Sequence, residues 1–220
     1  MQVIANGVDP AEFPPASKRP VVLAAGRIWD EAKNLASLAA IAGELAWSVE
    51  IAGDAAHPDR GVASIAPARA IGRLDPAAMR NALTTAAIFA APARYEPFGL
   101  AILEAASAGC ALVLGDIPSL RENWEGAAVF VDPDDREGLR AALQQLIADA
   151  GMRYRLAAAA RSRAGRFGLA RMGERYRTLY ADLIASGGRA RIAVPAPNVC
   201  DPDGRTPAFA EATSNLGALR

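Results

Sequence analysis

Short apolar runs alternate with longer amphipathic segments along the first 186 residues of the chain. The first run, "VVLAAG" (21–26), ends on glycine, which is typical of a buried strand. Similar runs predict further strands at 47–53, 68–74, 87–92, 111–115 and 127–132. Continuous apolar runs of this length indicate strands that are buried on both faces of a parallel sheet.

The segments between these runs have the spacing of helices. In residues 33–46, apolar side chains recur every three or four positions, which is the period of one helix face. Residues 75–86 begin with Asp75 as a predicted N-cap and Pro76 at the first helical position. Further helices are predicted at 98–109, 134–149, 151–166 and 170–186.

This alternation predicts an α/β fold: a Rossmann-like, doubly wound parallel sheet with helices on both faces. We expect one domain over residues 1–186, with ligands bound at the carboxyl ends of its strands. Residues 187–220 are rich in Gly, Pro and polar side chains, and we expect them to form a loose, flexible tail. No G-x-G-x-x-G follows the first strand, which argues against a dinucleotide oxidoreductase.

Composition narrows the class of protein further. The formal net charge is +0, so it gives no reason to expect a nucleic-acid partner. The two cysteines, Cys110 and Cys200, make no disulfide framework, and Cys110 lies in an apolar run as a core residue would. We therefore expect a reduced, cytoplasmic protein. No stretch approaches the ~18 apolar residues that a membrane span needs.

Two charge patterns have alternative interpretations. Residues 151–177 carry eight arginines and one acid, Glu174, which suits either a solvated helical face or weak contact with an anionic membrane surface. Asp-x-Asp pairs occur at 132–134 and 201–203 and could hold a divalent metal. The first precedes a predicted helix, so we interpret it as N-cap chemistry, and the second as a turn. We expect no metal site.

The most informative chemistry follows the strand at 87–92. Glu96 lies in the loop after this strand, and Glu104 follows it with seven residues between them. The helix predicted to begin near Phe98, Gly99 and Leu100 starts between the two, and its first amides are free to bind a phosphate. Carboxylates accept hydrogen bonds from hydroxyls, so this spacing suits a ligand with hydroxyls on both sides of a diphosphate.

Basic residues follow the first strand at the same edge of the predicted sheet. Arg27 comes directly after this strand, and Lys33 lies at the start of the next predicted helix. Arginine binds phosphate oxygens as a two-pronged donor and lysine as a point charge. Together with the helix start, they predict a diphosphate site.

Four segments in this order, "GRIWDEAKN", "IGRL", "EPFGLAILEAASAG" and "DIPSLRE", resemble the C-terminal domain of a GT-B glycosyltransferase of retaining family 4. The two glutamates match the E-x7-E motif of that family. "NGVD" (6–9) resembles the linker into this domain, and residues 167–180 resemble its closing helix. The resemblance covers roughly residues 4–185.

The resemblance implies a role for each matching residue. Arg27 and Lys33 would bind the donor diphosphate, and Glu96 would act with them in catalysis by holding the donor sugar. Glu104 would hold the ribose hydroxyls. Gly26 is among the implied donor-binding residues. The backbone of Gly72, Arg73 and Leu74 would face the nucleobase. The amides of Phe98, Gly99 and Leu100 would help to hold the donor sugar and its phosphate.

The resemblance also implies that the chain is the donor half of a two-domain enzyme, since it begins at the linker. A glycan, lipid or small-molecule acceptor would be bound by a missing N-terminal domain or a separate subunit. The expected reaction is hexosyl transfer from a nucleotide-diphosphate sugar, with retention, no metal and no cofactor. A non-catalytic nucleotide-sugar binding module, or an inactive fragment, is the alternative. The sequence leaves the donor base, sugar and acceptor open.

Overall fold

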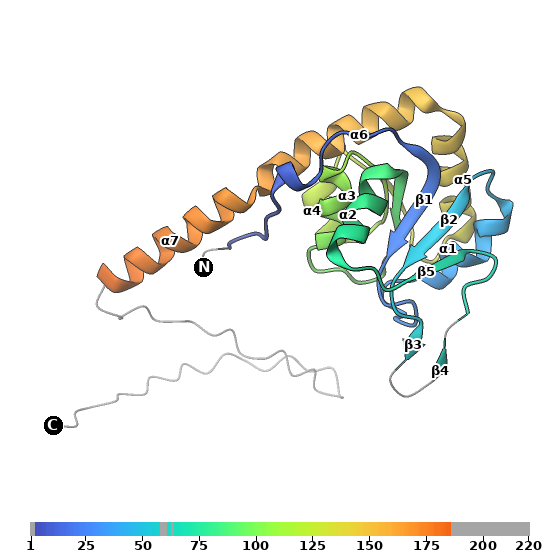
Figure 1. The fold of residues 1–220 in the computed structure, drawn as a ribbon, viewed down its shortest axis with the longest axis horizontal. Coiled ribbons are helices and arrows are strands. Elements are labelled where there is room, and N and C mark those ends of the chain that lie inside the picture. Colours follow the sequence, from blue (N-terminus) through green and yellow to red (C-terminus); the bar gives the residue numbers. More distant parts are fainter. Residues whose placement is uncertain (1–2, 58–60, 63, 186–220) are drawn as a thin grey trace, which may run out of the picture. The chain divides into compact units, whose positions relative to one another are not determined.

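The computed structural model describes residues 3–57, 61–62 and 64–185. Its centre is a six-stranded parallel sheet in the order β5-β2-β1-β6-β7-β8 (Figure 1). The strands are β1 (Arg19–Ala25), β2 (Ser48–Ala52), β5 (Arg69–Gly72), β6 (Ala86–Ala91), β7 (Ala111–Gly115) and β8 (Val129–Val131). The chain moves outward from β1 in one direction and from β6 in the other, so a ligand site is expected where β1 and β6 adjoin.

Seven helices and a small hairpin complete the part of the chain that the structure describes. The helices are α1 (Leu35–Ile41), α2 (Pro76–Thr85), α3 (Leu100–Ser107), α4 (Pro118–Trp124), α5 (Arg136–Ala148), α6 (Ala150–Ala164) and α7 (Leu169–Ala185). Short 3-10 turns are η1 (Pro10–Glu12), η2 (Ala42–Glu44) and η3 (Gly165–Phe167). The hairpin pairs β3 (Ala56–His57) with β4 (Gly61–Val62). The sheet and its helices form one compact unit that extends to Tyr180.

The sheet separates two hydrophobic cores. Successive side chains of a strand point to opposite faces, and β1 shows this directly. Val22 and Ala24 pack with residues of α1 and α5, while Leu23 packs with residues of α2, α3, α4 and α6. Helices therefore cover both faces, as in Figure 1, and the predicted doubly wound α/β fold is confirmed. Cys110 is fully buried in the second core, as expected.

Each predicted strand has a counterpart within a few residues, but two helix predictions need correction. The helix predicted from residue 33 begins at Leu35, because Asn34 has a left-handed φ of 54° that no α-helix accepts. It ends at Ile41 and continues as η2. The helix α4 was not predicted; it begins with Pro118 at its first turn. The predicted tail at 187–220 lies outside the described residues.

Candidate functional site

The carboxyl ends of β1, β2 and β5 surround a hollow of about 400 Å³. We call it the carboxyl-edge hollow; it is lined in part by Gly26, Arg27, Arg73 and Leu74. These four residues come from two loops that are far apart in the sequence, those after β1 and β5, and all four were candidate site residues. The loops after β1 and β2 approach each other closely at Gly53, where a Cβ would lie 1.8 Å from the carbonyl oxygen of Gly26. Glycine is therefore required at this position.

Lys33 connects this hollow to Glu96. Its side chain packs over Gly26, where an added Cβ would meet the Lys33 Cγ at 3.3 Å. Its Nζ then donates to the Glu96 Oε2 at 2.6 Å. Lys33 therefore contacts both Gly26, in the loop after β1, and Glu96, in the loop after the neighbouring strand β6. Both charged side chains are largely covered, at 26% and 17% exposed.

The start of α3 requires a glycine. Gly99 has a φ of 84°, in the left-handed region, and a Cβ there would approach the Ile102 Cδ1 to 2.7 Å. Glu96 occupies this helix start in the structure: its Oε1 accepts a hydrogen bond from the Gly99 amide at 2.9 Å and a longer one from Phe98 at 3.4 Å. Leu100 begins the helix and is 49% exposed. The amides predicted to bind phosphate thus partly hold a carboxylate of the chain itself.

Ser119 fixes the backbone of the same loop. This first-turn residue of α4 donates from its Oγ to the main-chain oxygen of Glu96 at 2.7 Å. Ser119 belongs to the segment "DIPSLRE", but no role for it was predicted from the sequence. The signal was the proline before it, which marks a helix start.

Arg27 is also paired with a carboxylate. Its Nε lies 3.1 Å from the Asp30 Oδ2, and its guanidinium is 5.3 Å from the centre of the Trp29 ring. Burial alone would raise the pKa of Asp30, but the hydrogen bonds from Arg27 and the Ala32 amide, with the charges of Arg27 and Lys33, lower it overall. Both predicted phosphate-binding cations therefore have an internal anionic partner that a phosphate would replace.

Glu104 lies apart from this group and outside the lining of the carboxyl-edge hollow. It is half-buried on α3, and its nearest charged influences are Glu12 and Arg80. Burial first, and then the charge of Glu12, raise the pKa of the Glu104 carboxyl, while Arg80 opposes them. The structure therefore separates the two glutamates of the motif into different environments.

Asn34 braces the loops around the site and was missed from the sequence. It is 3% exposed, and its Nδ2 donates to the main-chain oxygens of Pro92 at 2.9 Å and Pro133 at 2.8 Å. Its Oδ1 accepts from the Ser37 hydroxyl at 2.7 Å and from Arg94. These contacts join the loops that follow β1, β6 and β8, next to Lys33. An asparagine directly before a predicted helical face was the available signal, since asparagine tolerates left-handed backbone.

The first Asp-x-Asp pair is structural. The Asp132 carboxylate accepts from the Asp134 amide, and Asp134 pairs with Arg94 at 2.7 Å. The N-cap of α5 is the neighbouring Asp135, which accepts from Gly138, so the capping residue lies one position beyond the pair. Among the described residues, no cluster of acids, histidines or cysteines could hold a metal ion. The pair at 201–203 lies outside them.

None of the helices in the described ranges is both long and apolar enough to cross a membrane. The arginine-rich segment at 151–177 forms α6, η3 and the first half of α7. Contact of this segment with a membrane surface stays a prediction.

Solved structures share the fold. A sucrose-phosphate synthase from Thermosynechococcus elongatus superposes with a TM-score of 0.74 at 22% identity, covering 84% of this chain and 53% of its own. Anabaena Alr3699/HepE, solved with UDP-glucose, gives a TM-score of 0.72 at 18% identity over 83% of this chain and 57% of its own. These likenesses establish the GT-B-type Rossmann-like fold of the domain.

Sequence relatives point the same way. A glycogen synthase of Mycobacterium tuberculosis is 33% identical over 178 residues, which are 73% of this chain and 43% of that protein. The chain thus spans about half the length of the proteins it matches. The model of the glycosyl transferases group 1 family matches residues 19–149, which is more than half of the chain and includes every candidate residue above. The chain is therefore a member of the group 1 glycosyltransferases.

Proposed function

We propose that this chain is the C-terminal, donor-binding half of a retaining, family 4 hexosyltransferase that uses a nucleotide-diphosphate sugar. The contact series Gly26–Lys33–Glu96–Gly99 carries the proposal, because it joins a cation and a helix start at the place where β1 and β6 adjoin. The solved complex of the Anabaena relative with UDP-glucose supports the ligand class. The length of the matched relatives supports a second, acceptor-binding half.

The nucleoside would lie in the carboxyl-edge hollow, against the backbone of Arg73 and Leu74. The diphosphate would replace Asp30 on Arg27 and share Lys33 with Glu96. Glu96 would then accept hydrogen bonds from the sugar hydroxyls. Since Glu104 lies outside this hollow, its predicted ribose contact would need the ligand to extend along α3.

The proposed reaction needs no protein nucleophile. An acceptor hydroxyl bonds to the anomeric carbon while the bond from that carbon to the phosphate oxygen breaks. The acceptor proton passes to the departing diphosphate. Arg27, Lys33 and the amides at the start of α3 stabilise the charge that develops on this leaving group, which is electrostatic catalysis by groups already in place.

Calorimetric titration of the chain with UDP, GDP and ADP tests the binding step. We expect one of them to bind, and Lys33→Ala and Arg27→Ala each to weaken binding by about 1.5–3 kcal/mol, the loss of one charge-assisted contact. Arg69→Ala, which removes an exposed cation paired with Glu50, is the matched control and should have no effect. Affinity that is unchanged in both test variants would remove the diphosphate from these residues.

Mixing the chain with an acceptor-binding half separates the enzyme from a non-catalytic module. Hexosyl transfer by the mixture, with the configuration of the donor retained, is expected and should persist in EDTA. Nucleotide binding without turnover would favour the binding-module alternative.

A further inference from the structure

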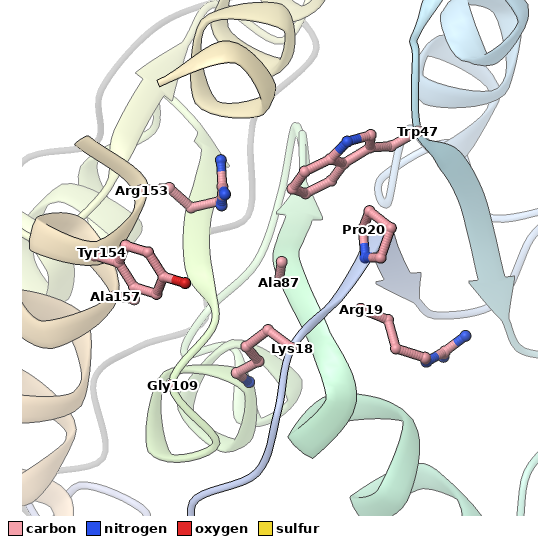
Figure 2. A pocket seen from close by; sticks show the side chains of 9 residues that line it. All are labelled: Lys18, Arg19, Pro20, Trp47, Ala87, Gly109, Arg153, Tyr154 and Ala157. Atoms are coloured by element: carbon pink, nitrogen blue, oxygen red, sulfur yellow. The ribbon is translucent and has the colours of Figure 1, made fainter. Parts of the chain in front are cut away.

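A second hollow lies at the opposite edge of the sheet, where the strands begin. It has a volume of about 230 Å³ and is bordered by Arg19, Trp47, Gly109 and Tyr154, which lie at or near the starts of β1, β2 and β7 and on α6. We call it the amino-edge hollow (Figure 2). β1 is seven residues long, so this hollow is roughly 20 Å from the carboxyl edge at ~3.3 Å per residue.

Three cations border the amino-edge hollow, and the charged ends of two of them, Lys18 and Arg19, are turned away from it (Figure 2). The Lys18 Nζ donates to the main-chain oxygens of Ala108 at 2.7 Å and Leu83 at 3.4 Å. Arg19 reaches Glu50 at 3.5 Å. Arg153 donates to the Leu146 oxygen at 2.5 Å. The Arg153 guanidinium, in contrast, faces the space (Figure 2) and lies 4.7 Å from the centre of the Trp47 ring.

The partners of these cations also offset their charge. Ala108 and Leu83 belong to the C-terminal ends of α3 and α2, and Leu146 lies in the last turn of α5. Each helix C-terminus carries about half a negative charge, and Glu50 adds a full one. These partners offset much of the charge of the three cations, although Glu50 is shared with Arg69, so the hollow is a weaker site for a free anion than three cations would suggest.

The groups that do face the hollow suit a neutral ring with hydroxyl groups. The Tyr154 hydroxyl points toward its middle, and the Trp47 ring borders it on another side (Figure 2). Ala87 and Ala157 give it a small, apolar floor. An aromatic ring packs on the apolar C–H face of a sugar ring while its polar end bonds a hydroxyl.

The volume and hydrogen-bond capacity of the amino-edge hollow narrow the class of ligand that it can bind. A volume of about 230 Å³ is below the roughly 300 Å³ at which sites for drug-sized ligands begin, so one ring is the natural occupant. Arg19 and Arg153 each have five N–H donors and use a minority of them. The spare donors of Arg153, whose guanidinium faces the hollow, can bond neutral hydroxyl oxygens.

We propose that the amino-edge hollow binds one pyranose ring of a saccharide, through Trp47, Tyr154 and Arg153. This site is separate from the donor edge and does not depend on the proposed function there. In a glycosyltransferase, this site would bind a saccharide chain at a ring that is remote from the end of the chain that reacts.

Nuclear magnetic resonance of the three tryptophan indole N–H signals gives a direct test. Maltose and methyl α-D-glucopyranoside are the probes, and Trp47→Phe and Trp29→Phe assign the signals. We expect the sugars to shift the Trp47 signal in a saturable way, with a dissociation constant on the order of 1 mM. UDP should shift Trp29, which lines the carboxyl-edge hollow, and leave Trp47 in place.

Variants of Tyr154, whose side chain is 67% exposed, provide the second test. Tyr154→Phe should weaken sugar binding roughly twofold to tenfold, the loss of one neutral hydrogen bond, and Tyr154→Ala should weaken it more. Tyr180→Ala, an equally exposed tyrosine at 59%, is the matched control and should bind as the parent does.

Three results would overturn the proposal. They are a Trp47 signal that neither sugar moves, sugar binding that survives Tyr154→Ala unchanged, and a Trp47 shift caused by inorganic phosphate alone. The last would make the hollow an anion site. UDP binding is detected at Trp29 and sugar binding at Trp47. A negative result with the sugars therefore does not contradict the donor site, and a negative result with UDP does not contradict the amino-edge site.

Discussion

Replacing Asn34 tests how the carboxyl edge is held together. Asn34→Ala removes two hydrogen bonds to main-chain oxygens, a buried one to Pro92 and a part-buried one to Pro133, and the acceptor of Ser37 and Arg94. Two lost hydrogen bonds cost about 2 kcal/mol together. The left-handed φ of 54° adds about 1 kcal/mol for an alanine. We therefore expect the free energy of unfolding to fall by about 3 kcal/mol, a large part of the total for a domain.

Urea unfolding measures this change, and two further variants divide it. Asn34→Gly tolerates the left-handed backbone, so it isolates the hydrogen-bond loss of about 2 kcal/mol. Asn81→Ala is the control, since Asn81 is exposed within α2 and should change stability by about 0.5 kcal/mol or less. The slope of free energy against urea should stay constant.

A loss below about 1 kcal/mol in both Asn34 variants would refute the bracing role, because the two donated bonds alone exceed that value. The same variants should weaken nucleoside diphosphate binding under conditions where they remain folded. The reason is that Asn34 fixes the backbone beside Lys33 and the loop that leads to Glu96.

Three further outcomes follow from the geometry. Glu96→Gln should spare a bare nucleotide and weaken the sugar-bearing donor, whereas Glu104→Gln should weaken both; titrations that give one pattern for both variants would reject separate roles. Gly99→Ala should lower the melting temperature more than Gly126→Ala, since both have a left-handed φ (84° and 75°) but only the former Cβ meets Ile102; equal losses would show that the contact costs nothing. Burial raises the pKa of the Glu104 carboxyl above 4.5, so the folded state binds its proton more tightly and stability falls as pH rises from about 4.5 through the raised value. Glu104→Gln should remove this component of the pH profile of unfolding; a profile identical to the parent's would contradict it.

The sequence by itself determined the layer architecture. Most strands of the sheet lie in short apolar runs, and the helix caps are local, as at Asp75, whose carboxylate accepts from the Ala78 amide as predicted. Local signals also marked Gly99, because the turn that begins α3 demands a left-handed residue. Features that depend only on residues close together in the sequence can be predicted from the sequence alone.

Tertiary structure decided which groups meet. Lys33 and Glu96 are 63 positions apart, and Asn34 and Pro133 are 99 apart. No local pattern could therefore show that Lys33 forms a salt bridge with Glu96, or that Asn34 donates a hydrogen bond to the Pro133 main-chain oxygen. The same holds for Trp47 and Tyr154, which border one hollow from different elements. Which edge of the sheet a residue reaches follows from its strand, but its partner there depends on the order β5-β2-β1-β6-β7-β8. That order is fixed by burying both faces of the sheet at once, a property of the whole chain and of no single segment.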